Sequence, residues 1–271
     1  EEPPRTADRG ADFRTLPIDR STADDATLDA LIRDLQTRQG LVRAALAEDE
    51  DHQPLSFIGA ARIENGAESL ARSIQNTLAI DLQEFRSAKT PTDAFAYLRQ
   101  RAEGIGIFVM LAGNLGSHHS AIPVETFRGY AIADALAPFV VVNDQDARTA
   151  WSFTLLHEIA HVWLGTTGVS GARAENSIEQ FCNDVAGEIL VPIHELSSVS
   201  LGRSADVNEA IDFISTFAGQ RHVSRQMVAY RLFRRDRITR ALWVEIDHRL
   251  REVGPRGGCH RPWRRRGSCE W

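Results

Sequence analysis

Residues 154–161 read Thr-Leu-Leu-His-Glu-Ile-Ala-His, and the two histidines of this segment, His157 and His161, stand four residues apart. On a helix this offset projects both imidazoles from one face, one turn apart, so that a single tetrahedral metal ion can take a nitrogen from each. Glu158 lies about 100° around the helix from His157. It is therefore a poor third ligand, but it can reach a water at the ion. The pattern predicts two metal ligands, His157 and His161, and one catalytic base, Glu158.

Apolar residues share the helix face that carries the two histidines, and they are Phe153, Leu156, Ala160 and Leu164. This face is expected to point inward. A buried polar side chain without a partner costs on the order of 1 to 3 kcal/mol. Hydrogen bonds to the backbone would satisfy two core histidines one by one, whereas a metal ion satisfies both at once. We favour the metal site.

A catalytic zinc ion needs a third protein ligand and an open fourth position. After glycines at 165–171, where the chain can turn back, a second amphipathic helix is predicted. Its apolar set is Ile178, Phe181, Val185, Ile189 and Leu190. Glu179 lies beside this set, and the small side chains of Cys182 and Ala186 let the two helices approach closely. Glu188, further along in a more crowded stretch, is the competing third ligand. A structural zinc site is the other alternative, but such sites are closed and commonly rich in cysteine.

The rest of the chain predicts helices around a small sheet. Apolar residues recur at helical spacing in three segments of the first half, 28–46, 64–79 and 92–103. Short runs rich in Ile, Val, Phe and Tyr predict three strands, at 105–111, 128–133 and 139–143. If 139–143 is an edge strand bordering the cleft, a substrate can bind extended along it through main-chain hydrogen bonds.

Residues 206–217 and 224–233 predict two short helices, with Ser224 as the N-cap of the second. A helix-turn-helix that contacts DNA is one interpretation of this pair. Neutralising Arg225 and Arg231 together would test it through the loss of salt-dependent DNA binding. Packing against the helices of the metal site explains the same apolar residues equally well.

The formal net charge of -6 argues against a protein that mainly coats nucleic acid, because neutralising phosphates requires an excess of cations. Any DNA contact would have to be local. The cysteines Cys182, Cys259 and Cys269 suggest no disulfide framework, which favours a reducing compartment. The longest apolar run, 105–113, is far below the roughly 20 residues of a membrane span, and no signal peptide is visible. We therefore expect a cytoplasmic protein without a membrane partner.

Four segments together form a pattern that is more specific than the metal motif alone. They are Phe-Val-Val-Val-Asn at 139–143, Phe-Thr-Leu-Leu-His-Glu-Ile-Ala-His at 153–161, Glu-Gln-Phe-Cys-Asn at 179–183 and Ala-Gly-Glu-Ile-Leu-Val-Pro at 186–192. This pattern resembles the ImmA/IrrE family of metallopeptidases, over roughly residues 95 to 235.

The resemblance implies that the glutamate preceding the Cys-Asn pair, Glu179 here, is the third zinc ligand. It also implies site-specific cleavage of a DNA-binding repressor, which switches on stress, phage-related or mobile-element genes. Zn²⁺ is the expected cofactor. Mn²⁺ is an alternative, because nitrogen and oxygen sites of this kind accept several divalent metals.

The sequence thus predicts an α+β fold with a zincin-like metallopeptidase core, a small three-stranded sheet and mostly helical surroundings. We expect a helical N-terminal region (1–90), the metallopeptidase core (91–200), a helical, helix-turn-helix-like C-terminal region (201–253) and a basic tail (254–271). The predicted function is zinc-dependent, site-specific cleavage of a helix-turn-helix repressor. The alternative is a transcriptional regulator or antitoxin-like protein whose peptidase-like domain senses without cleaving. An intact Glu158 favours the enzyme, because a scaffold has no chemical need for the base.

Overall fold

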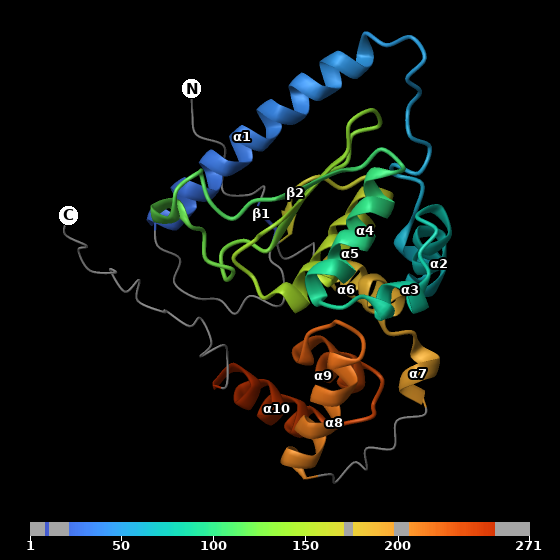
Figure 1. Ribbon diagram of the computed structural model, residues 1–271, viewed down its shortest axis with the longest axis vertical. Helices are drawn as coiled ribbons and strands as arrows, with labels where there is room; N and C mark the ends of the chain where they lie inside the picture. The colour runs from blue at the N-terminus through green and yellow to red at the C-terminus, as the bar shows by residue number, and fades with distance from the viewer. Residues whose placement is uncertain (1–8, 11–21, 171–175, 198–205, 253–271) are drawn as a thin grey trace, which may run out of the picture.

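The structure is a computed structural model that describes residues 9–10, 22–170, 176–197 and 206–252, in which helices surround a small sheet (Figure 1). Within these residues the helices are α1 (Thr22–Ala47), α2 (Ala67–Thr77), α3 (Leu82–Ser87), α4 (Pro91–Glu103), α5 (Arg148–Leu164), α6 (Asn176–Leu190), α7 (Ile193–Ser197), α8 (Val207–Gly219), α9 (Arg225–Arg234) and α10 (Arg240–Glu252). The strands are β1 (Arg9–Gly10), β2 (Phe108–Leu111), β3 (Gly129–Ile132), β4 (Phe139–Val142) and β5 (Val169–Ser170). Two 3₁₀ turns, η2 (Ile63–Asn65) and η3 (His118–Ser120), lie in the connections. The expected α+β class is confirmed.

The three predicted strands form one sheet in the order β2-β4-β3. β2 runs parallel to β4, and β3 runs antiparallel to it. The expectation that 139–143 is an edge strand is therefore wrong, because β4 is central. All four of its residues, Phe139 to Val142, are buried, as is typical of a strand covered on both faces.

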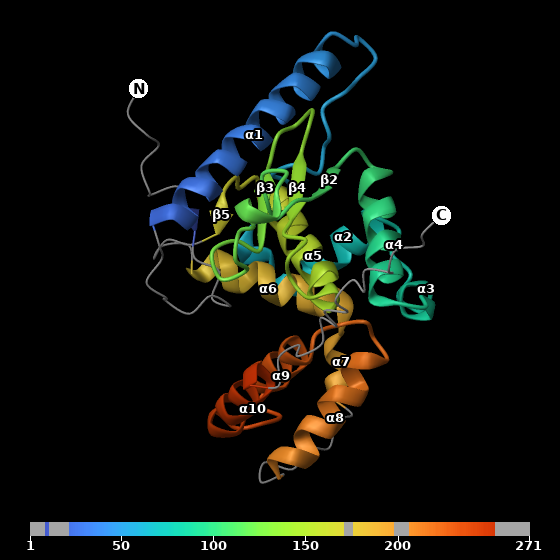
Figure 2. The same ribbon diagram turned by 60° about the vertical axis from the view of Figure 1, so that its left-hand side comes forward.

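One face of the sheet is covered by α1, which crosses it on the side away from α5 (Figure 2). Alternate strand residues point to this side and pack with the leucines of α1. They include Tyr130, Ile132, Phe139 and Val141, and the helix contributes Leu28, Leu31 and Leu35. The sequence periodicity of α1 thus reflects burial against the sheet.

The opposite face of the sheet packs on α5. Val140 and Val142 of β4 point to this side together with Ala131 of β3. At Gly129 and Ala131, β3 presents only small residues to α5, so that the helix can approach its backbone closely. β3 is an edge strand of this sheet, and near its end the Gly168 N–H donates a hydrogen bond of 3.1 Å to the Ala131 carbonyl.

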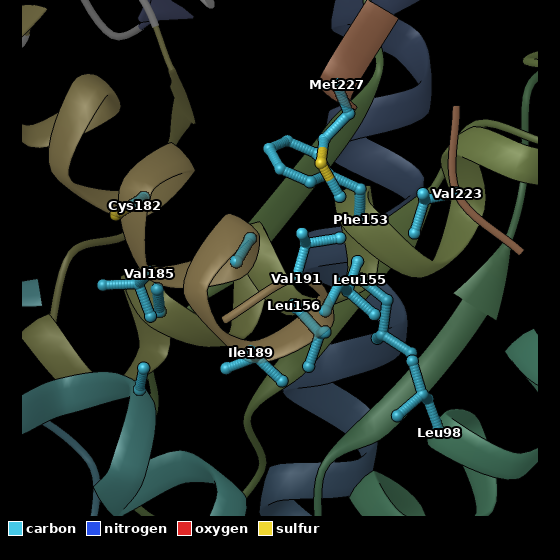
Figure 3. Close-up of a cluster of buried hydrophobic side chains, with 14 of the residues drawn as sticks. Leu98, Phe153, Leu155, Leu156, Cys182, Val185, Ile189, Val191, Val223 and Met227 are labelled. Atoms are coloured by element: carbon cyan, nitrogen blue, oxygen red, sulfur yellow. The ribbon is translucent and has the colours of Figure 1, made fainter. Parts of the chain in front are cut away.

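The C-terminal helices α8, α9 and α10 gather beneath α5 and α6 (Figure 1). Met227 of α9 and Val223 before it reach the same apolar cluster as Phe153 and Leu155 of α5 (Figure 3). Ser224 caps α9 as predicted, because its side chain accepts a hydrogen bond from the Met227 N–H at 3.1 Å. The buried core runs without a break from α2 to α10.

Arg231 of α9 is buried, so replacing this residue is not a suitable test for a DNA contact. Its guanidinium donates to Glu188 Oε2 at 2.6 Å and to the Val191 carbonyl at 2.7 Å. Neighbouring Arg234 pairs with Asp184 of α6 at 2.9 Å. These contacts favour the interpretation that α9 packs against α6, and a DNA contact stays an untested prediction.

Three sequence predictions concern other parts of the chain. The basic tail 254–271, with Cys259 and Cys269, lies outside the described residues. The division of the chain into four regions also stays a prediction. Within the described parts of the chain, none of the helices combines the length and the apolar character needed to traverse a bilayer.

Candidate metal centre

Helix α5 ends so that its last histidine gains a polar partner. Gly165 adopts a left-handed conformation (φ 71°, ψ 23°), which terminates the helix and turns the chain back. The turn brings the Thr166 hydroxyl within 3.0 Å of His161 Nδ1, and this hydroxyl also donates to the His161 carbonyl at 3.2 Å. Because the hydroxyl proton is directed to that carbonyl, Thr166 Oγ1 can accept the Nδ1 proton of His161.

His157 is held in the same way from α6. Its Nδ1 lies 3.1 Å from Asn183 Oδ1, while the Asn183 amide donates to the Glu179 carbonyl at 2.8 Å. The amide group is therefore oriented with its oxygen toward the imidazole, and His157 Nδ1 carries the proton. In both histidines the lone pair is left on Nε2, which is the nitrogen that a metal requires.

The two Nε2 atoms converge with the Glu179 carboxylate. The two Nε2 atoms lie 3.1 Å apart, and each is 3.1 Å from an oxygen of Glu179. The ligand atoms of His157, His161 and Glu179 all lie within 4.8 Å of one another. The three side chains are 1%, 7% and 2% exposed. Two imidazole lone pairs and a carboxylate facing each other in a buried site repel unless a cation lies between them, so the residues fit a divalent metal ion.

Electrostatics favour the ligand form of Glu179. Burial by itself raises the pKa of this carboxyl, but imidazoles of His157 and His161 that carry a proton on Nε2 donate to it and outweigh that effect, so that they hold the pKa below its usual range. Cys182, one turn further along α6, behaves differently. Burial raises the pKa of its thiol, and the carboxylates of Glu179 and Glu158 raise it further. The thiol is therefore protonated in the absence of a metal ion, and Cys182 does not belong to the group of converging ligand atoms.

Glu158 lies in the same buried site, against β3. Its side chain is buried, and it occupies the space that a side chain at Gly129 would need. A Cβ built on Gly129 would lie 2.8 Å from Glu158 Cγ and Cδ and closer still to Oε1. Glycine is required here for close approach, and β3 thus forms the wall that holds the carboxylate of Glu158.

The competing third ligand, Glu188, is engaged elsewhere. Its Oε2 accepts the Arg231 hydrogen bond described above, and its Oε1 accepts one from the Ile193 N–H at 3.0 Å. It belongs to the packing between α6 and α9, so the structure favours Glu179 over Glu188 as the third ligand.

Sequence reasoning missed three residues that support the site: Thr166, Asn183 and Gly129. Asn183 had a usable signal, because it follows Glu179 by four residues and so lies on the same face of its helix. Gly129 had none, because its role depends on a contact between segments far apart in the chain. Thr166 follows His161 by only five residues, but its contact depends on the turn at Gly165 that ends α5.

We expect replacement of Asn183 by alanine to weaken metal binding by roughly 10- to 100-fold, since the partner that orients a ligating histidine is worth about that much. Competition with a chromophoric chelator measures the dissociation constant. Asn76→Ala, at an exposed position of α2, is the matched control. Equal affinity of Asn183→Ala and wild type would show that the hydrogen bond does not position His157.

A helix that carries His-Glu-x-x-His, a glutamate from the following helix and a small mixed sheet beside them define the class of zincin-like metallopeptidase domains. Residues 102–233 match the model of the Peptidase_M78 family, described as the IrrE N-terminal-like domain. Residues 102–233 therefore form a domain of this family, and the resemblance to ImmA/IrrE metallopeptidases found in the sequence is confirmed. No curated protein gave a match to the chain.

Proposed function

We propose that this protein is a zinc-dependent endopeptidase in which His157, His161 and Glu179 hold the metal and Glu158 is the general base. The observation that carries the proposal is the convergence of three ligand atoms within 4.8 Å of one another, next to the buried carboxylate of Glu158 on the same helix as the two histidines. The membership of segment 102–233 in a peptidase family supports it.

The protein residues account for the proton transfers of peptide hydrolysis. A divalent metal ion held by the three ligands would polarise the peptide carbonyl and acidify the attacking water. Glu158 accepts the proton of that water as its oxygen attacks the carbonyl carbon. Glu158 then delivers this proton to the leaving amine, so the carboxylate of Glu158 is regenerated. The products are a carboxylic acid and a neutral amine, and transfer of the second water proton from the acid to the amine gives their usual charged forms. Asn183 and Thr166 keep the two histidines in the Nδ1–H form throughout.

Strand β3 is the element best placed to align a polypeptide with these groups. It is an edge strand, and Gly129 at its start contacts Glu158. An extended chain can add to such an edge by main-chain hydrogen bonds. We therefore assign to β3 the role of substrate-binding edge strand that the sequence suggested for 139–143.

The close approach of Gly129 to the Glu158 side chain leads to a prediction for the variant Gly129→Ala. The added methyl group should displace the Glu158 carboxylate and lower kcat by about 100-fold, since misplacing a catalytic group by about 1 Å can cost that much. Metal content should not change, because Gly129 contacts no ligand. Gly40→Ala in α1, with no atom within 4 Å of its Cβ, is the control. Normal kcat in Gly129→Ala would contradict the placement of Glu158.

The substrate that we propose is a helix-turn-helix repressor whose cleavage induces stress or mobile-element genes. The family membership and the extended edge beside the site support a protein substrate. The zinc-loaded protein would be incubated with repressors encoded near its own gene, and the products identified by mass spectrometry. A single internal cut supports the proposal. Intact repressors together with repressor or DNA binding would favour the non-cleaving regulator instead.

A further inference from the structure

A pocket of about 210 Å³ lies between the first half of α5 and the helices α9 and α10. We propose that it is a specificity subsite that takes one large apolar side chain of the polypeptide substrate, within three residues of the scissile bond. This inference rests on the proposed peptidase function and names a substrate feature that the metal site alone does not specify.

The pocket lies along α5 on the N-terminal side of the metal ligands. Ala150 and Phe153 line the pocket, and they share one face of α5 with His157 and His161, at offsets of three, four and four residues. The rings of Phe153 and His157 have centroids 6.4 Å apart. From Ala150 to His157 the helix rises about 10 Å, and an extended chain covers that distance in about three residues.

The start of β3, together with the residue before it, also connects the pocket with the metal centre. Arg128 lines the pocket, and the next residue, Gly129, contacts Glu158. Two separate segments, β3 and α5, therefore each contribute to both the metal centre and the pocket.

The lining selects an apolar occupant. Phe153 and Met227 meet on one wall (Figure 3), and Trp243 and Tyr230 contribute two further aromatic rings. Burial raises the pKa of Tyr230 to about 12, so its phenol is neutral at physiological pH. These four side chains therefore carry no charge that a bound group could contact.

The charged residues of the pocket are already paired with each other. Arg128 donates to Asp146 at 2.8 Å, and Arg251 donates to Asp247 at 2.8 Å. A charged substrate side chain would lose its water here without gaining an ion of opposite charge, which is unfavourable. The pocket volume corresponds to that of about seven molecules of liquid water. This volume suits one leucine, methionine or aromatic side chain, and it is too small for a helix or a strand.

The first test measures binding without catalysis. The chain has only two methionines, Met227 in the pocket and Met110 on β2, so [methyl-¹³C]methionine labelling gives a probe and an internal reference. Titration with N-acetyl-leucinamide should shift the Met227 signal saturably and leave Met110 unchanged, whereas N-acetyl-glycinamide should shift neither. No saturable shift of Met227, or equal shifts of both signals, would overturn the proposal.

Variants that fill the pocket sharpen this test. Ala150→Phe places a ring in the pocket from α5, and Gln226→Trp blocks it from the exposed mouth on α9. Both should abolish the Met227 shift. Thr149→Phe, at a neighbouring position of α5 that does not line the pocket, should retain it. A shift that persists in both filled variants would place the ligand elsewhere.

The second test uses cleavage of a degenerate peptide library by the zinc-loaded protein. Wild type and Thr149→Phe should prefer large apolar residues by at least about 10-fold at one position within three residues of the cut. Ala150→Phe and Gln226→Trp should lose that preference and still cleave peptides with alanine there. Cleavage without the preference would refute the subsite and leave the peptidase proposal intact. Absence of any cleavage by wild type would refute both.

Discussion

Glu158→Gln is expected to lower peptide hydrolysis by roughly 10²- to 10⁴-fold, the range that a positioned general base contributes. The amide has nearly the shape of the carboxylate but cannot accept the proton of the attacking water. Because Glu158 is not a ligand, zinc content and thermal stability should match those of wild type. Steady-state kinetics on a cleaved peptide, with zinc measured by atomic absorption, tests both statements on one sample.

A matched control separates loss of the base from loss of a charge. Glu125→Gln removes the same charge at an exposed position of the loop before β3 and should leave kcat unchanged. Two outcomes would count against the assignment. Full activity in Glu158→Gln would mean that another group accepts the proton, and loss of zinc from this variant would mean that Glu158 is itself a ligand.

The second large effect is expected from Glu179→Ala. Removing a direct ligand should weaken zinc binding by more than the roughly 10- to 100-fold that loss of an orienting partner causes. Hydrolysis should become undetectable at zinc concentrations that saturate wild type. The variant also leaves two imidazoles facing each other in a buried site, and among the described residues no further His, Cys, Asp or Glu belongs to this group of converging ligand atoms.

Stability provides a readout of this variant that does not depend on activity. A ligand that binds only the folded state at 100 times its dissociation constant stabilises it by about 2.7 kcal/mol. Added zinc should therefore raise the Tm of wild type and of the control Glu125→Gln, and it should have little effect on Glu179→Ala. An equal rise in Tm for Glu179→Ala would show that zinc binds without this carboxylate.

The local parts of the site could be predicted from the sequence. The spacing of His157 and His161 is a property of one helix, and helical periodicity alone places both on one face. Glu179 required a contact between two helices, which the small residues on the second helix suggested and the family resemblance named. The structure brings these ligand atoms within 4.8 Å of one another.

The parts that could not be predicted depend on pairings between distant segments. Strand order is such a property, so β4 was expected at an edge and lies in the centre. Its sequence held a weaker signal, because four consecutive apolar residues without alternation indicate burial on both faces. The helix α3 is only six residues long, too short for a periodic pattern. Gly129 could not be linked to Glu158 without the packing of β3 on α5.

Arg231 illustrates the same limit for electrostatics. In the sequence, an arginine on the second helix of a helix-turn-helix is equally suited to a DNA contact and to an ion pair. The structure buries it against Glu188, which also removes Glu188 from the candidates for the third ligand. One long-range contact thus changes the interpretation of two residues that the sequence treated separately.

A crystal structure of the zinc-loaded protein, with anomalous scattering recorded at the zinc edge, tests the central claim most directly. We expect one ion bound by Nε2 of His157 and of His161 at about 2.0 to 2.1 Å and by Glu179 at about 2.0 to 2.2 Å, with solvent in the fourth position. A fourth protein ligand at the ion, or zinc bound away from these three side chains, would contradict the account.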